Sequence, residues 1–600
     1  MFPLACVSLL LTPLALGVAN EELSDGSCAL SLRAETQSSP TPLQFVGGPS
    51  IEATEFVQAS QVRSRDDMPS TKDCRWELFE QPLSHFDPTN VTFQQRVCIY
   101  DGYVDGDGGP IFFYPGHESP VDFYINNTGL MWEVGKEVGA LLVFAEHRYV
   151  GESSPTLTGM SGCLKYLTTE EAMADFAKIA WNLTRVATED GSYAAPTSKI
   201  VAFGGSHGAR LSTLMRLKYP HLISGAIASS MIANNMVDTP KEEWGNYYRV
   251  IRKGMDLVPH CGDGMNGYQE KKASLIAPVL NAAIPGLCKP VETDMDLIGL
   301  HQALTTNYLD KLARSSLPFE SNYMTAGSYL ENPVVLPPWA LQALCEKFNE
   351  TAAGVTITGD MDKLIYTMKM KGVTIEVDWG TTLNNEYSAE ELSKSGMPEL
   401  IAAILAAQQS IWGEGKHSFI PQRVSMQGPA DVCTRELNSS KAWGVLVAND
   451  LNYAAEAPPT GLVYSAPPWQ SFARDWTVKE KIQEQEAATA RTVLKWATEE
   501  GLPGARPGKI DLYADEFKFS LKSMVREMSN VFFTVGELDP WGGSGLTEEM
   551  AIQHPSNGFA LIKRGGHHVD LFFSTDQDYE ELRQVREDEK RFIKSIIKGK

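Results

Sequence analysis

Ser206 stands in the stretch Gly-Gly-Ser-His-Gly, residues 204–208, where an apolar run gives way to a helical pattern. This is the G-x-S-x-G arrangement of a nucleophilic serine on a sharp strand-to-helix turn. The small residues beside the serine allow the strained turn to form. The helix that follows directs its backbone N–H groups toward developing negative charge. The same stretch also fits a glycine-rich turn with a solvated serine. The chemistry therefore depends on whether the chain supplies a base and an acid.

An acid and a histidine pair occur late in the chain, each where an apolar run ends. Asp539 ends one run, and His567 and His568 end the next. The carboxyl ends of parallel strands gather at one edge of a sheet, and the order serine, acid, histidine suits this arrangement. We predict Ser206 as the nucleophile, His567 as its general base and Asp539 as the group that orients the imidazole. Taken singly, Asp539 also fits a turn before Pro540, and either histidine fits an ordinary surface or core position.

The tetrahedral intermediate of acyl transfer needs two hydrogen-bond donors. The first would be the backbone N–H of His207, the residue after the nucleophile. The second should lie in the loop after an early strand, residues 114–119, where Gly116 and His117 are the candidates. His117 and Glu118 could also line the substrate cleft or simply pack.

Strands that alternate with helices are needed to bring these residues together. Short apolar runs indicate buried strands, and apolar residues at helical spacing indicate helices. This alternation predicts a parallel sheet with crossover helices, the α/β-hydrolase fold. The expected strands are residues 109–114, 140–148, 200–205, 223–232, 530–540 and 558–568, and the expected helices are residues 170–187 and 578–599.

The nucleophile and the acid are separated by residues 207–538, far more than the core requires. Two or three further βα units would take only about 60–90 residues. The excess predicts a large, mostly helical cap domain inserted between nucleophile and acid, at residues 236–500. The other expected segments are a signal peptide at 1–19, a polar N-terminal segment at 20–75, and the two parts of the hydrolase core at 76–235 and 501–600.

The start of the chain points to a secretory pathway. Residues 1–19 are apolar and uncharged and end in small residues, as in a signal cleaved near Ala19; a membrane anchor is the alternative. No other segment reaches the roughly 18 apolar residues that cross a bilayer. Of nine cysteines, only Cys6 lies in this segment, and the even remainder predicts disulfides whose pairing stays open. Five N-glycosylation sequons agree with a secreted or lysosomal or vacuolar protein: Asn90, Asn126, Asn182, Asn349 and Asn438.

Charge and cysteine spacing exclude other classes of function. The formal net charge is −23, which argues against nucleic acid, because phosphate binding needs clustered lysine and arginine. No CxxC or similar metal-ligand spacing occurs, so we do not expect zinc. A serine hydrolase that forms an acyl-enzyme and hydrolyses it with water needs neither a metal nor another cofactor. The sequence leaves open whether the chain forms a homodimer.

Several long stretches resemble one family of secreted and lysosomal serine peptidases, that of Pro-Xaa carboxypeptidase, dipeptidyl peptidase II and thymus-specific serine protease. The resemblance implies an α/β-hydrolase peptidase that forms an acyl-enzyme and cleaves peptides after proline, or a similar small residue, near one terminus. It also implies that the first histidine of the pair, His567, is catalytic and that Trp541 lines the substrate pocket. The stretches are residues 81–96, 109–119, 126–135, 144–155, 166–177, 203–211, 536–545 and 565–571.

The chain departs from that family around the nucleophile. His207 stands where tyrosine is usual, Ala209 where glycine is usual, and Arg210 where an apolar residue is usual. Two rival functions therefore remain: an esterase or lipase on the same core, and a binding protein that keeps the fold without activity. The sequence does not decide between exopeptidase and endopeptidase, or which peptide terminus is recognised.

Overall fold

A computed structural model describes eleven segments of the chain. Most of the expected N-terminal segments, much of the cap region and the Asn438 sequon lie outside the described residues. The described segments are residues 68–104, 109–155, 166–185, 197–231, 246–262, 310–321, 335–353, 356–360, 365–370, 373–378 and 525–599.

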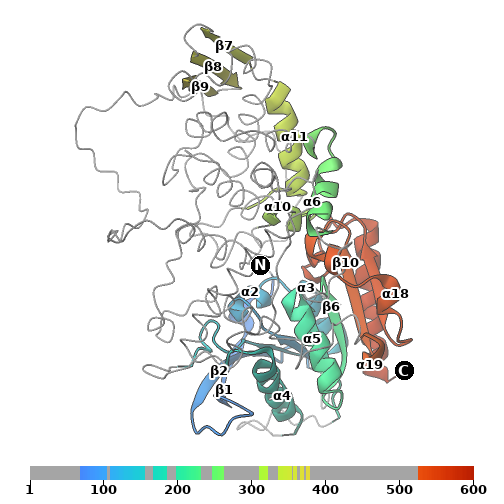
Figure 1. The fold of residues 1–600 in the computed structure, drawn as a ribbon. Helices are drawn as coiled ribbons and strands as arrows, with labels where there is room; N and C mark the ends of the chain where they lie inside the picture. Colours follow the sequence, from blue (N-terminus) through green and yellow to red (C-terminus); the bar gives the residue numbers. More distant parts are fainter. Residues whose placement is uncertain are drawn as a thin grey trace, which may run out of the picture.

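An eight-stranded sheet forms the centre of the protein, in the order β1-β2-β4-β3-β5-β6-β10-β11 (Figure 1). Its strands from β4 to β11 in this order run parallel, and β1 and β2 pair antiparallel at one edge. Helices join the parallel strands, which confirms the predicted α/β-hydrolase fold. The strands are β1 Arg75–Pro82, β2 Thr92–Tyr100, β3 Ile111–Pro115, β4 Leu141–Ala145, β5 Ile200–Gly205, β6 Ile223–Ser229, β10 Val531–Gly536 and β11 Gly558–Ile562.

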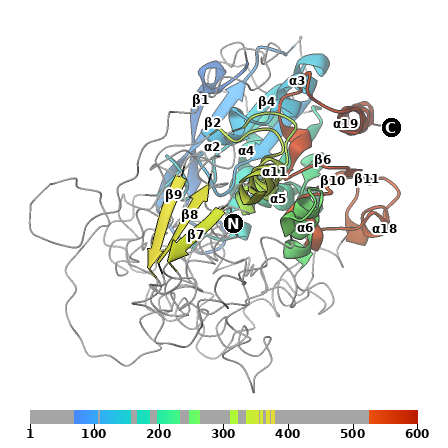
Figure 2. The same cartoon turned by 90° about the horizontal axis from the view of Figure 1, so that it is seen from above.

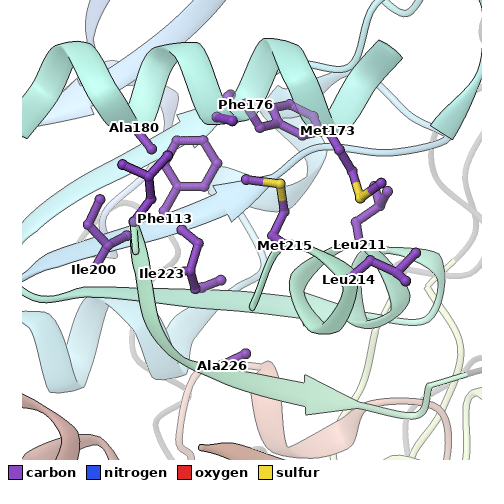
Figure 3. Packing of buried hydrophobic residues seen from close by; sticks show 14 of the residues in the cluster. Phe113, Met173, Phe176, Ala180, Ile200, Leu211, Leu214, Met215, Ile223 and Ala226 are labelled. Atoms are coloured by element: carbon purple, nitrogen blue, oxygen red, sulfur yellow. The ribbon is translucent and has the colours of Figure 1, made fainter. Parts of the chain in front are cut away.

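Helices cover both faces of the sheet and bury its alternating side chains. On one face, α4 and α5 pack their apolar residues on strand residues such as Phe113 and Ile200 (Figure 3). On the other face, α2, α3 and α19 pack on the residues that alternate with these, such as Phe112 and Val201. The helices are α2 Val121–Ile125, α3 Gly129–Val138, α4 Thr169–Arg185, α5 His207–Lys218, α18 Glu548–Ala551 and α19 Glu580–Lys598.

The two antiparallel edge strands were not anticipated from the sequence. Residues along β1 alternate between exposed and half-buried positions, and both Trp76 and Leu78 keep exposed surface. Such a strand lacks the continuous apolar run that marks the buried parallel strands. A disulfide between Cys74 and Cys98 ties the start of β1 to β2, as expected for a chain made in an oxidising compartment.

The described part of the cap region contains both helices and strands. Helices α6 Asn246–Asp256, α10 Asp310–Arg314 and α11 Ala340–Ala353 lie beside the carboxyl ends of the sheet strands (Figure 1). A disulfide joins Cys261, after α6, to Cys345 in α11. The sequence analysis expected helices here, and it missed a three-stranded antiparallel sheet, seen beside α11 in Figure 2. Its strands are β7 Thr356–Asp360, β8 Ile365–Met370 and β9 Val373–Asp378.

Four of the five sequons fall within the described residues. Asn90 and Asn126 are exposed, and Asn182 and Asn349 are partly buried. The Asn349 amide nitrogen, which would carry the glycan, donates to the Pro259 carbonyl at 2.7 Å. Across the described segments, no helix is both long enough and apolar enough to cross a membrane.

Candidate active site

Ser206 lies between the end of β5 and the first residue of α5, as the motif predicts. Its φ of 58° and ψ of −123° place a non-glycine residue in a strained region of backbone space. The Ser206 N–H donates to the Ser229 carbonyl at the end of β6, at 2.9 Å, which holds the turn on the sheet. Only 2% of Ser206 is exposed, so the turn is covered rather than open to solvent.

The small residues around Ser206 are required by close packing. A Cβ on Gly204 would lie 2.1 Å from the Gly208 carbonyl oxygen. A Cβ on Gly208 would lie 2.6 Å from the ring of His117. The turn can therefore form only without side chains at these two positions, and the loop after β3 lies directly against it.

Asp539 and His567 come together at the ends of β10 and β11. The His567 Nδ1 lies 2.9 Å from Asp539 Oδ1 and 3.0 Å from Asp539 Oδ2. Both side chains are fully buried, and the Trp541 N–H donates to the same Oδ1 at 3.1 Å. Within the described residues, the His567 Nε2 has no hydrogen-bond partner. The Ser206 hydroxyl is therefore not hydrogen-bonded to Nε2 in this structure, and the two groups must approach each other when substrate binds.

The end of β6 links the serine turn to the histidine loop. Ser229 binds the Ser206 N–H through its carbonyl, and the next residue, Ser230, accepts the His568 N–H on its hydroxyl at 2.8 Å. A Cβ on Gly205 would lie 2.9 Å from the ring of His568. The sequence analysis did not identify these two serines, although a serine pair at a strand exit is a visible signal.

A segment of the cap region also binds the histidine loop. The His567 N–H donates to the Arg314 carbonyl at 3.0 Å, and the Gly566 N–H donates to the Ser316 carbonyl at 2.9 Å. A Cβ on Gly566 would lie 2.7 Å from the Arg314 carbonyl oxygen. Because these contacts use main-chain atoms, nothing in the side-chain sequence indicated them.

The two candidates for the second oxyanion donor differ in their hydrogen bonds. The Gly116 N–H donates to the Ala145 carbonyl at 2.8 Å and is therefore engaged within the sheet. The His117 ring is held by the hydroxyls of Tyr114 and Tyr124, at 3.2 and 3.0 Å. Because the Gly116 N–H is already engaged, His117, whose ring lies against the serine turn, remains the candidate of the two.

Glu118 lies in the same buried cluster and contacts His117 Nδ1. Burial raises the pKa of the Glu118 carboxyl, but the charge of His117 and a hydrogen bond with its ring outweigh burial and hold the pKa well below its usual range. The site therefore keeps one carboxylate in addition to Asp539. Burial lowers the pKa of His207 and of His568 well below the usual value, so both rings stay neutral. Trp541 is buried beside Asp539, and its ring is not shown to form a pocket.

In the part of the chain that the structure describes, no group of three histidine, cysteine, aspartate or glutamate side chains is placed to hold an ion. The arrangement of a strained serine, an imidazole and a buried carboxyl group is suited to nucleophilic attack on a carbonyl group.

Comparison with known proteins confirms the resemblance seen in the sequence. Residues 81–263 match the family described as serine carboxypeptidase S28. Lysosomal Pro-X carboxypeptidase of Bos taurus is 26% identical over 92% of this chain and 93% of its own length. The protein of the same name from Mus musculus is 37% identical over 51% of this chain and 59% of its own length. The alignment with a crystal structure of proline iminopeptidase from Mycobacterium smegmatis spans 87% of this chain and 99% of the iminopeptidase chain, with 9% identity and a TM-score of 0.35.

Proposed function

We propose that this chain, which is similar over residues 81–263 to the family described as serine carboxypeptidase S28, is a serine-type peptidase that hydrolyses peptides through Ser206, His567 and Asp539. The observation that carries the proposal is the hydrogen bond between His567 Nδ1 and Asp539, at 2.9 Å, with the opposite ring nitrogen left without a partner. The strained backbone at Ser206 supports it independently.

In the proposed reaction, Ser206 Oγ attacks the carbonyl carbon of the scissile bond and gives its proton to His567 Nε2. Asp539 holds the ring in the required tautomer and stabilises the imidazolium. The developing oxyanion accepts hydrogen bonds from the N–H groups of His207 and His117. His567 then protonates the departing amine, which leaves an acyl ester on Ser206. Water, deprotonated by His567, hydrolyses that ester and frees the serine.

For the substrate, we propose peptides with proline before the cut bond near the carboxyl terminus. The names of the relatives, Pro-X carboxypeptidases, support this choice, and so does a site that is almost fully buried. A covered nucleophile admits a peptide end more readily than the middle of a folded chain. The lysosomal relatives and the two disulfides support a secreted or lysosomal location.

A peptide with proline at both the second and the penultimate positions tests the substrate. Mass spectrometry of the products would show release of one carboxyl-terminal residue if the proposal is correct. Release of an amino-terminal dipeptide would overturn the choice of terminus and leave the chemistry intact. Faster turnover of simple acyl esters than of any proline peptide would favour the esterase alternative. Absence of labelling of Ser206 by a fluorophosphonate would refute the proposed chemistry.

A further inference from the structure

Two fully buried carboxyl groups lie beneath the loop that carries the histidine pair. Asp570 belongs to the short 3-10 helix Val569–Leu571 that follows His568, and Glu589 lies on α19. Neither group belongs to the site described above. A buried carboxyl that lacks a counter-charge is costly, so each of the two needs an explanation.

Asp570 is held by hydroxyl groups from two strands. The Ser229 hydroxyl, from β6, donates to Asp570 Oδ1 at 2.6 Å. The Thr534 hydroxyl, from β10, donates to Asp570 Oδ2 at 2.9 Å. Both carboxyl oxygens of Asp570 therefore already accept a hydrogen bond from a hydroxyl group.

Glu589 has the opposite pattern. Neither of its oxygens receives a hydrogen from any donor among the described residues. Burial raises its pKa well above the usual value, and the nearby Asp570, by charge and by a side-chain hydrogen bond, raises it further. A hydrogen bond between two carboxyl groups requires a proton on one of them, and the hydroxyl donors of Asp570 leave that proton to Glu589.

The cations nearby do not neutralise Glu589. Arg586, on the same helix, donates one Nη group to the Phe572 carbonyl and the other to the Val569 carbonyl, at 3.2 Å for the latter. Its Nε lies 3.4 Å from Asp578. Arg586 lowers the pKa of Glu589 in part without reversing the shift.

The other elements packed here add no charge to the pair. On the outer side of α19, the Lys590 ammonium pairs with Glu137 of α3, at 2.7 Å. The strands β6 and β10 face Asp570 with the hydroxyls of Ser229 and Thr534. Arg586 is the one cation among the described residues that acts on the charge of Glu589.

We propose that Asp570 and Glu589 share one proton, and that this carboxyl pair fastens the His567 loop to α19, β6 and β10 as an acid-adapted positioning device. Its catalytic consequence rests on the proposed function, because the pair acts through the position of His567. Arg586 of α19 also holds the segment after His568, because its guanidinium donates to the Val569 and Phe572 carbonyls. The loop is thus bound on one side by α19 and on the other by the cap carbonyls of Arg314 and Ser316.

The sign of the pH dependence follows from the raised pKa of Glu589. At acidic pH the folded and unfolded states both carry the proton, and the pair contributes its full stability. As pH rises above the usual glutamate value, the unfolded chain loses the proton while the folded chain keeps it. The free energy of unfolding then falls until the pH passes the pKa of Glu589 in the folded chain. Stability that is greatest at acidic pH suits a protein that works in an acidic compartment.

Unfolding of the full chain by urea at several pH values between about 4.5 and 7 tests the shared proton. Glu589→Gln keeps a donor to Asp570 and removes the titration. Relative to this variant, the folding constant of the wild type should fall about tenfold per pH unit, the slope of one proton. Glu587→Gln, an exposed position of the same helix, is the matched control and should follow the wild type. Equal slopes for the wild type and Glu589→Gln would overturn the inference.

Activity then tests the link to His567. Glu589→Leu removes the bond to Asp570 and should lower kcat by about 10–100-fold with little change in KM, because a displaced base affects the chemical step. Glu589→Gln should restore kcat and keep it constant to higher pH than the wild type. An unchanged kcat in Glu589→Leu would overturn the positioning role. If no peptide is hydrolysed by the wild type, the proposed function fails, and the urea experiment still decides whether the proton is shared.

Discussion

Replacing Asp539 with asparagine should disable the base without disturbing the fold. In the wild type, His567 Nδ1–H donates to the Asp539 carboxylate at 2.9 and 3.0 Å, and the Trp541 N–H also donates to Oδ1. In Asp539→Asn, the Trp541 N–H fixes the amide oxygen at the Oδ1 position. The amide nitrogen then takes the Oδ2 position and donates to Nδ1. The proton of the imidazole is forced onto Nε2, the atom that should accept the proton of Ser206.

The size of the loss follows from this change of tautomer. A triad with the wrong tautomer loses about 10⁴ in kcat, which corresponds to about 5.4 kcal/mol of activation free energy. The loss should appear in kcat for a proline peptide and equally in the rate of fluorophosphonate labelling, since both need the same base. KM should change little, because Asp539 is fully buried beneath His567 and is not a surface for substrate.

An exposed aspartate in the same region supplies the control. Asp576→Asn makes the same chemical change at an exposed position after the histidine loop and should leave kcat as in the wild type. Urea unfolding of Asp539→Asn should show that the variant is folded under the assay conditions. A loss in kcat of less than about tenfold in a folded Asp539→Asn variant would refute the assignment of the acid.

Three further predictions follow from the same contacts. Ser206→Ala should abolish both hydrolysis and fluorophosphonate labelling with an unchanged circular dichroism spectrum. His567→Ala should lower kcat by several orders of magnitude, and His568→Ala should lower it far less. The reverse order would mean that the base is His568. Gly566→Ala should lower kcat more than it lowers the midpoint of urea unfolding, because its Cβ would lie 2.7 Å from the Arg314 carbonyl oxygen and push the histidine loop away; an unchanged kcat would show that the cap carbonyls do not position His567. Asp175→Asn should lower the free energy of unfolding in urea by about 3–5 kcal/mol. The reason is that Arg148, bound to Asp175 at 2.7 and 2.8 Å, is fully buried and would lose its main counter-charge. A loss below about 1 kcal/mol would show that this ion pair contributes no more than an exposed one.

The sequence predicted the parts of the fold that depend on local pattern. The serine turn was visible because it needs glycine at two close contacts, and the buried parallel strands because they are uninterrupted apolar runs. The pairing of Asp539 with His567 followed from a general rule, since both residues end neighbouring parallel strands. These predictions required no knowledge of which side chains touch.

Other parts could not be predicted because they depend on contacts distant in the sequence. The carbonyls of Arg314 and Ser316 bind the histidine loop through main-chain atoms that every residue has. Glu589 lies at the helical spacing of the buried residues Val585 and Ile593, but a glutamate is almost always exposed, so its burial was not predicted. The strand β1 alternates like an exposed edge, so its pairing with β2 becomes visible only in three dimensions.

The end of β6 explains how the proposed triad, assembled from distant segments, keeps its spacing. This strand lies between β5, which carries the serine, and β10, which carries the acid, yet it supplies no triad residue. Ser229 binds the Ser206 N–H with its carbonyl and Asp570 with its hydroxyl, while Ser230 binds the His568 N–H with its hydroxyl. The Ser206 turn and His568, the neighbour of the proposed base, are thereby each held to these two residues by one hydrogen bond. The distance between the proposed nucleophile and base is set in part by β6 and β10, the two strands that lie between β5 and β11. Because these strands belong to the central sheet, an insertion in the cap region leaves their spacing unchanged.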